Sequence, residues 1–119
     1  MTGSKKDDSQ KPELTLVSRA FLEATARAMM WGKNKYHKHN YLVTGFAQQR
    51  LLAAAMRHLV AYNDGEDLDP ESGNCHLDHA CGALNMLIDL MHKGKAPDDR
   101  YHEPVVETSV FEPCMPEEV

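Results

Sequence analysis

The sequence predicts a small all-α protein, a bundle of three to four helices. Apolar residues recur at helical spacing in three separate stretches, and the alternating β-branched runs that are typical of strands are absent. The 119 residues are enough for one domain. No apolar run approaches the roughly 18 residues of a membrane-spanning helix, and the polar N-terminus does not resemble a secretory signal, so we expect no membrane partner.

The first helix is expected from Ser18, which is a suitable N-cap, to Trp31, with Gly32 as its stop. Outside the core, Glu23 and Arg27 are spaced to form an i,i+4 ion pair. The expected buried stripe of this helix consists of Leu22, Thr25, Ala26 and Met29.

The second helix is expected over about 47–62, and it carries two apolar stripes. One stripe contains Leu51, Ala55, His58 and Tyr62, and the other contains Leu52, Met56 and Leu59. The third helix follows a Pro- and Gly-containing turn, with Asn74 as its cap, and ends at about His92. Its expected core stripe consists of Leu77, Ala80, Leu84, Leu87, Ile88 and Met91. Because one neighbour cannot cover two stripes, we expect a fourth segment or homo-oligomerisation to complete the bundle.

The chain is expected to divide into a flexible leader (1–12), a helical domain (13–93) and an acidic, Pro-containing tail (94–119). Asp78, Asn85 and Asp89 form a polar stripe on the third helix that we expect to face solvent or another subunit. The three cysteines include no Cys-x-x-Cys pair, which favours a reducing cytoplasm over a disulfide framework.

Charge is strongly segregated along the chain. The tail 94–119 has two basic and seven acidic residues, so its formal charge of −5 equals that of the whole chain. Within the neutral remainder, residues 19–58 contain seven basic residues and one acid, whereas residues 64–89 contain seven acids and neither Lys nor Arg. Folding can bring these segments together around one cleft, with phosphates on the basic side and a divalent metal on the acidic side. Two solvated faces that neutralise each other are the alternative.

The basic segment contains candidate phosphate and base contacts. Its loop 32–41 offers lysines for phosphates and tyrosines for stacking on a base, and Arg50 and Arg57 can hold phosphate oxygens bidentately. The candidate nucleotide-binding residues are Lys33, Lys35, Tyr36, Asn40, Arg50 and Arg57. We expect no DNA or RNA polymer as a partner, because this loop is short and residues 1–93 as a whole carry no net positive charge.

The acidic segment contains candidate metal ligands and histidines. The carboxylates of the loop 64–73 are close enough in sequence to repel one another unless a bound cation or basic groups reduce that repulsion. The positions of the glycines in this loop do not match an EF-hand. His76 and His79 lie three residues apart on one helix, and His58 lies on an apolar stripe of another. Three converging imidazoles are able to ligate a metal, bind a phosphate or act as a general base; core histidines are the alternative.

The sequence is similar to the N-terminal domain family of the phage dATP/dGTP diphosphohydrolases over about residues 8–92. The residues that carry the resemblance are Lys11, Pro12, Gly32, Lys35, Tyr36, Asn40, Arg57, His58, Gly65, Glu66, Asp69, Ser72, Gly73, His76 and His79. The resemblance implies an all-helical enzyme of the MazG-like kind in the host cytoplasm. Such an enzyme uses Mg²⁺ to hydrolyse a purine (deoxy)nucleoside triphosphate to the monophosphate and pyrophosphate.

In that interpretation Glu66, Asp69, Glu71 and His76 hold Mg²⁺, while His58, His79 and Glu66 serve catalysis. The same residues fit a second hypothesis, a non-catalytic phage sponge that sequesters a nucleotide immune signal such as a cyclic nucleotide or an ADP-ribose derivative. A third hypothesis is a structural bundle that binds a protein partner through the acidic tail. A panel of nucleotides with and without Mg²⁺, read by both thermal shift and product analysis, separates the three.

Overall fold

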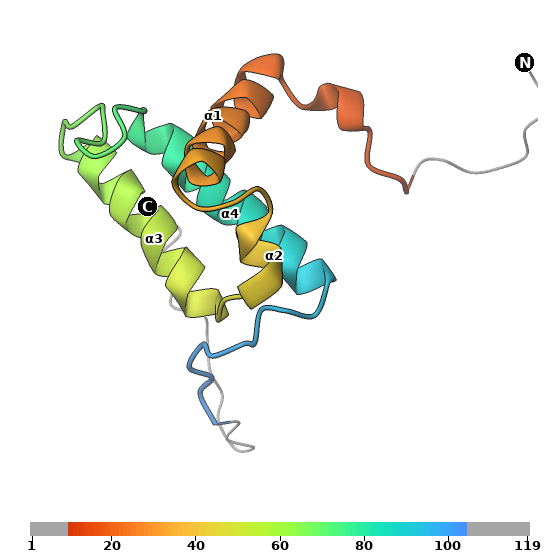
Figure 1. The fold of residues 1–119 in the computed structure, drawn as a ribbon. Coiled ribbons are helices and arrows are strands. Elements are labelled where there is room, and N and C mark those ends of the chain that lie inside the picture. Colours follow the sequence, from red (N-terminus) through yellow and green to blue (C-terminus); the bar gives the residue numbers. More distant parts are fainter. Residues whose placement is uncertain (1–9, 105–119) are drawn as a thin grey trace, which may run out of the picture.

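The computed structural model describes residues 10–104, and residues 1–9 of the expected leader and 105–119 of the expected tail lie outside this range. The described part contains a short 3₁₀ turn, η1 (Leu14–Leu16), and the helices α1 (Arg19–Lys35), α2 (Asn40–Thr44), α3 (Gln48–Asn63) and α4 (His76–His92). Helix α3 lies beside α4, and α1 also packs on α4 (Figure 1). The prediction of a small all-α fold is confirmed for these residues, in which β-pairing is limited to one isolated bridge, Leu68–Cys75.

Helix α1 begins where the sequence predicts and ends later. The Ser18 hydroxyl accepts a hydrogen bond from the backbone N–H of Phe21 (3.1 Å), so Ser18 is the N-cap. Gly32 does not stop the helix, and that prediction is wrong. The backbone N–H of Tyr36 still donates to the carbonyl of Gly32 (2.8 Å). A glycine inside a helix costs only about 1 kcal/mol relative to alanine, so it does not by itself end the helix.

The buried side of α1 differs from the expected stripe. Leu22 is 57% exposed, whereas Ala28 is buried against Gly82 of α4. A Cβ atom at Gly82 would lie only 2.7 Å from the Cβ of Ala28, so glycine permits this close crossing of the two helices. The expected Glu23–Arg27 pair is absent, since Glu23 accepts from Arg19 (2.7 Å) and Arg27 binds a carboxylate of α4.

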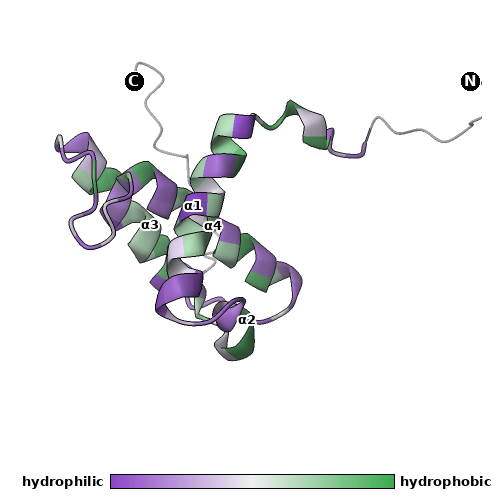
Figure 2. Cartoon of the chain, turned by 45° about the horizontal axis from the view of Figure 1, so that its top comes forward, coloured by the Kyte–Doolittle hydropathy of each residue, from purple (hydrophilic) through white to green (hydrophobic). Residues whose placement is uncertain are grey.

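Helices α3 and α4 form the hydrophobic core through Leu51, Leu87 and Leu90. The prediction for α4 is rotated relative to the structure: its buried positions are His76, Asp78, Ala80, Gly82, Ala83, Leu87 and Leu90. Four members of the expected core stripe are instead exposed, namely Leu77, Leu84, Ile88 and Met91. Small residues face α1 because they allow the backbones to approach, which leaves the larger apolar side chains outside. Hydrophobic and hydrophilic bands alternate along the helices (Figure 2).

Helix α4 also starts one residue after its expected first position. Cys75, rather than Asn74, is the N-cap, and its Sγ accepts from the backbone N–H of Leu77 (3.4 Å). The polar stripe expected to face solvent or another subunit is wrong for Asp78. Asp78 is 3% exposed and binds Arg27, and Asp89 accepts hydrogen bonds from Tyr41 and Lys93.

Residues 95–99 lie against the connection between α2 and α3. The backbone N–H groups of Phe46 and Gln48 donate to the carbonyls of Lys95 (3.3 Å) and Pro97 (3.0 Å), respectively. The backbone N–H of Gln49 donates to Asp99 Oδ1 (2.9 Å). The beginning of the acidic tail thereby holds the N-terminal end of α3 in place. No helix within residues 10–104 has the length and apolar character needed to cross a bilayer.

Candidate functional site

Three histidine side chains converge where α3 meets the start of α4. The Nδ1 atoms of His58 and His76 lie 2.9 Å apart. The ring of His79 stacks on that of His58, with a centroid distance of 4.8 Å and an interplanar angle of 21°. Helix α3 brings His58 to this point because it shares the face of Leu51 and Ala55, which packs on α4. His76 and His79 share one side of the first turn of α4.

The acidic loop folds back over these histidines. The backbone N–H of His76 donates to the carbonyl of Asp67 (2.9 Å), and the backbone N–H of Asp69 donates to that of Asn74 (2.8 Å). This places Glu66 Oε1 2.7 Å from His76 Nε2. His79 Nε2 lies 2.6 Å from Ser72 Oγ. The loop therefore provides polar partners to His76 and His79.

The local environment shifts the pKa values of two groups in this cluster. Burial lowers the pKa of His58, and the neighbouring imidazoles of His79 and His76 lower it further. Burial alone would raise the pKa of Asp69, but hydrogen bonds from the backbone N–H and hydroxyl of Ser72 outweigh it, so the net shift is downward. At neutral pH the cluster therefore presents a neutral His58 and an ionised Asp69.

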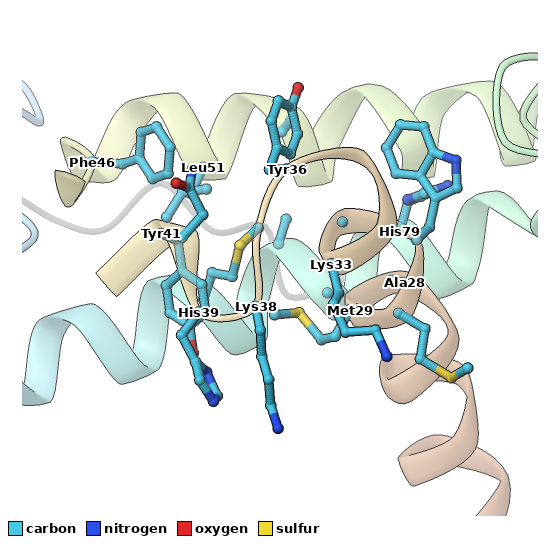
Figure 3. Close-up of a pocket in the computed structure, with 18 of the residues that line it drawn as sticks. Ala28, Met29, Lys33, Tyr36, Lys38, His39, Tyr41, Phe46, Leu51 and His79 are labelled. Carbon is cyan, nitrogen blue, oxygen red and sulfur yellow. The ribbon is translucent and has the colours of Figure 1, made fainter. Parts of the chain in front are cut away.

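A pocket of about 730 Å³ opens beside the cluster, bounded by α1, α3, α4 and the connection that contains α2. Phe46 and Tyr41 lie at one end of the pocket, His79 lies at the other, and Tyr36 lies between them (Figure 3). The basic residues of its lining are Lys33, Lys38, Arg50 and Arg57, and the large aromatic residues are Trp31, Tyr36, Tyr41 and Phe46. His58 and His79 belong to both the lining and the histidine cluster. The pocket thus offers cations and aromatic faces next to a group of imidazoles.

One group of donors in the described residues has the spacing of a metal site. Ligand atoms of His58, Asp69 and His76 all lie within 4.8 Å of one another. Glu66 and Glu71, which we expected as ligands, are engaged elsewhere: Glu66 binds His76, and Glu71 forms an ion pair with Lys35 (2.7 Å). Two imidazoles and one carboxylate do not match the carboxylate and water oxygens that Mg²⁺ prefers.

Comparison with known proteins identifies the family of the chain. The family described as "dATP/dGTP diphosphohydrolase, N-terminal" matches residues 1–100. The chain belongs to this family. A dATP/dGTP diphosphohydrolase of Salmonella phage PMBT28 is 35% identical over 100 residues, which are 84% of this chain and 33% of that protein. The chain thus spans about a third of the length of this curated relative. No solved structure matches the chain.

Most candidate residues of this diphosphohydrolase-family domain lie together. Five of the six candidate nucleotide contacts line the pocket, namely Lys33, Tyr36, Asn40, Arg50 and Arg57. The sixth, Lys35, lies outside the lining: its Nζ binds Glu71 and stands 4.8 Å from the centroid of the Trp31 ring. Hydrogen bonding to Glu71 raises the pKa of Lys35. The ion pair between these two residues connects the C-terminal end of α1 to the acidic loop.

Sequence reasoning missed two polar or aromatic groups of the site. Trp31 was assigned only to a helix end, yet its ring lines the pocket and contacts His79 edge-on, with a centroid distance of 5.4 Å. Ser72 was named only among the residues of the family resemblance, without a role in the site, yet its hydroxyl faces His79 and its backbone N–H donates to Asp69 (3.0 Å). The Asp-x-x-Ser spacing of residues 69–72 is a signal for this local hydrogen bonding.

Proposed function

We propose that this domain binds a purine (deoxy)nucleoside triphosphate and hydrolyses it to the nucleoside monophosphate and pyrophosphate. The observation that carries the proposal is the continuity of one pocket from basic and aromatic walls to the histidines. Its volume of about 730 Å³ is within the usual range for small-ligand sites. The name of the phage relative supports a nucleotide diphosphohydrolase as the reaction class.

The basic walls suit the triphosphate. Arg57 precedes His58 on α3, and its guanidinium is able to hold phosphate oxygens bidentately. The guanidinium of Arg50, two turns earlier on the same side of α3, stands 4.9 Å from the centroid of the Phe46 ring, so Arg50 lies at the end of the pocket away from His79. Lys33 and Lys38 contribute cations from the end of α1 and the connection after it. Stabilising charge on the phosphoryl oxygens is most of what phosphoryl transfer requires from a protein. Mg²⁺ enters, in this proposal, as a component of the nucleotide substrate.

The aromatic walls suit the base. Tyr36 is 56% exposed and offers a ring face to the pocket, and Phe46 and Tyr41 lie at the end away from His79. Stacking of a nucleobase on such rings contributes about 1–3 kcal/mol per base. We therefore orient the nucleotide with its base at this end of the pocket and its α-phosphate near His79. In this orientation the reacting phosphorus lies beside the imidazoles.

The histidines suit the water that attacks. In the proposed step, a water oxygen bonds to the α-phosphorus, the bond from that phosphorus to the bridging oxygen breaks, and pyrophosphate leaves with the electron pair. His79 reaches the pocket and is the candidate to accept the proton of this water, and His58, which stacks on His79, is the candidate to help orient it. Glu66 contacts His76 and is absent from the lining, so we assign it a positioning role.

The decisive experiment incubates the chain with each of the four dNTPs and Mg²⁺, and separates the products by chromatography. We expect dAMP or dGMP with one equivalent of pyrophosphate, and turnover at least 100-fold slower in His79→Asn, with His92→Asn as the matched control on the same helix. Nucleotide that binds and is recovered intact after denaturation would overturn hydrolysis and favour the sponge hypothesis. The absence of binding by any nucleotide would reject both.

We further propose that the protein acts in the host cytoplasm as a homo-oligomer that binds neither a nucleic-acid polymer nor a membrane. The support for oligomerisation is the exposed apolar face of α4 defined by Leu77, Leu84, Ile88 and Met91. These positions recur at helical spacing, so they form one continuous stripe along the helix. A second copy of the same chain presents the same stripe, and a two-fold axis would cover both.

A further inference from the structure

We propose that His58, Asp69 and His76 bind a divalent transition-metal ion, of which Zn²⁺ is the best example, with Glu66 orienting His76. This site shares Asp69 and His76 with the Mg²⁺ site expected from the sequence, but its third ligand is His58 instead of Glu66 and Glu71, and its metal is different. It stands whether or not the domain hydrolyses nucleotides, because it rests on the arrangement of these four side chains.

The spacing of the donor atoms fits such an ion. Ligand atoms about 2.0–2.2 Å from Zn²⁺, at angles between a right angle and the tetrahedral value, lie roughly 2.8–3.6 Å apart. The Nδ1 atoms of His58 and His76 are 2.9 Å apart, and the donor atoms of the whole group lie within 4.8 Å of one another. Small side-chain movements are therefore sufficient to reach coordination distances.

The partner of His76 determines which of its nitrogens is available. His76 is 4% exposed, and its Nε2 lies 2.7 Å from a carboxylate oxygen of Glu66. A neutral imidazole that donates its Nε2–H to a carboxylate has its lone pair on Nδ1, the atom that faces His58. A metal-ligating histidine usually donates its other N–H to a carboxylate in this way, which raises the basicity of the ligating nitrogen.

The remaining contacts hold the other two ligands. The backbone N–H of Ser72 donates to Asp69 Oδ2 (3.0 Å), which fixes the carboxylate of the loop. The ring of His79 stacks on His58 and restricts its orientation. The three ligands come from α3, the acidic loop and α4, so the ion would join these three segments of the fold.

The choice of metal follows from the ligand types. Imidazole nitrogens suit Zn²⁺, Co²⁺, Ni²⁺ and Fe²⁺, whereas Mg²⁺ requires oxygen ligands and retains several waters. Three protein ligands leave a tetrahedral ion one position for a non-protein ligand. Because His58 also lines the pocket, that position is accessible to a water or to an oxyanion bound there.

The test uses the full, untagged chain after treatment with a chelator, and no nucleotide. Titration with Zn²⁺, followed by calorimetry and elemental analysis, is expected to give one bound ion per chain and a higher Tm. Co²⁺ as the probe is expected to produce visible d–d absorption, and Mg²⁺ at the same concentration is expected to leave the Tm unchanged. Failure to retain Zn²⁺, or equal stabilisation by Mg²⁺, would overturn the proposal.

Variants locate the ion. His58→Gln is expected to abolish stoichiometric Zn²⁺ uptake, and Glu66→Gln to weaken it by about 10–100-fold. Glu71→Gln and His92→Ala are the matched controls and are expected to bind as the wild type does. Circular dichroism of the metal-free variants verifies that each is folded, and Glu66→Gln, at a half-exposed side chain, remains informative if His58→Gln does not fold. Unchanged uptake in both variants would assign the ion to another site.

Discussion

Arg27 of α1 holds the buried carboxylate of Asp78 on α4 through two hydrogen bonds. The distances are 2.6 Å from Nε to Oδ2 and 3.0 Å from Nη2 to Oδ1. The Asp78 side chain is 5% exposed, whereas that of Arg27 is 52% exposed. Hydrogen bonding to Asp78 raises the pKa of Arg27. This contact fixes α1, and with it one wall of the pocket, against α4.

Removal of the guanidinium is expected to destabilise the fold. Arg27→Met leaves a buried carboxylate without its cation, which is far costlier than the loss of a surface ion pair. We expect the Tm to fall by roughly 10 °C. Arg19→Met removes an exposed i,i+4 pair with Glu23 and is the control, with a change of a few degrees at most. Equal effects of the two variants in thermal unfolding would contradict the structural role of Arg27.

Two glycines that lie inside helices are expected to respond oppositely to alanine. Gly82→Ala places a Cβ 2.7 Å from that of Ala28, and such overpacking costs about 1–3 kcal/mol of unfolding free energy. Gly32→Ala meets nothing within 4 Å and is expected to stabilise α1 by about 0.5–1 kcal/mol. Denaturant unfolding measures both values. A stabilising Gly82→Ala would show that α1 and α4 do not approach as described.

Arg57 is expected to contribute directly to nucleotide affinity. Arg57→Ala removes a guanidinium from the pocket wall, and the loss of one charged hydrogen-bonding group corresponds to a Kd increase of about 10–100-fold for dGTP. Arg57→Lys retains the charge but not the bidentate geometry, and is expected to lose less affinity. Calorimetry with Arg19→Ala as the control checks this expectation. Affinity that is the same in Arg57→Ala as in the control would place the phosphates elsewhere.

Tyr41 is expected to titrate late and to make stability depend on alkaline pH. Burial and its hydrogen bond to Asp89 (2.7 Å) raise the pKa of Tyr41 to about 12, above its ordinary value of about 10. Because the folded-state pKa is the higher one, the contribution of Tyr41 to stability is complete below about pH 10 and is lost as the pH rises through about 12.

Absorbance titration of phenolate measures this shift. The wild type is expected to show a component near pH 12 that Tyr41→Phe lacks. Above about pH 10, the unfolding free energy of the wild type should also fall more steeply with pH than that of Tyr41→Phe. If all tyrosines titrate together near pH 10 in folded protein, Tyr41 does not donate to Asp89 in solution.

The exposed stripe of α4 is expected to be the contact between copies. Ile88→Glu places a charge at the centre of this stripe and should convert the oligomer to a monomer, as measured by light scattering after size-exclusion chromatography. Val43→Glu, at an 80% exposed position on α2, is the matched control. A wild-type chain that is monomeric at all concentrations would reject the proposed homo-oligomer.

Local patterns in the sequence were sufficient for much of the fold. The apolar spacing predicts α3 to within one residue at each end, and the hydroxyl of Ser18 identifies the start of α1. Both signals act within one or two turns of helix, where hydrogen bonding and periodicity depend on neighbouring residues alone. The short helix α2 lacks such a pattern and was missed, because its five residues do not complete two turns.

Which face of a helix is buried depends on what packs against it. In α4, the sequence favours the large apolar residues such as Ile88, yet Ala83 and Gly82 face inward because α1 crosses there. The local sequence favours a surface position for Asp78, but Arg27, 51 positions earlier, lies beside it in the fold and binds its carboxylate. Such long-range pairs are not encoded in the local periodicity of either helix.

The sequence by itself determined that the chain is helical, which family it resembles, and which stretches hold its cations, acids and histidines. Tertiary structure alone decided how these groups combine: Lys35 with Glu71, Glu66 with His76, and His58 with His76 and Asp69. The physical reason is that helix formation is a local equilibrium, whereas the partners of a charged or ligating atom are selected by close packing between segments that are distant in the chain.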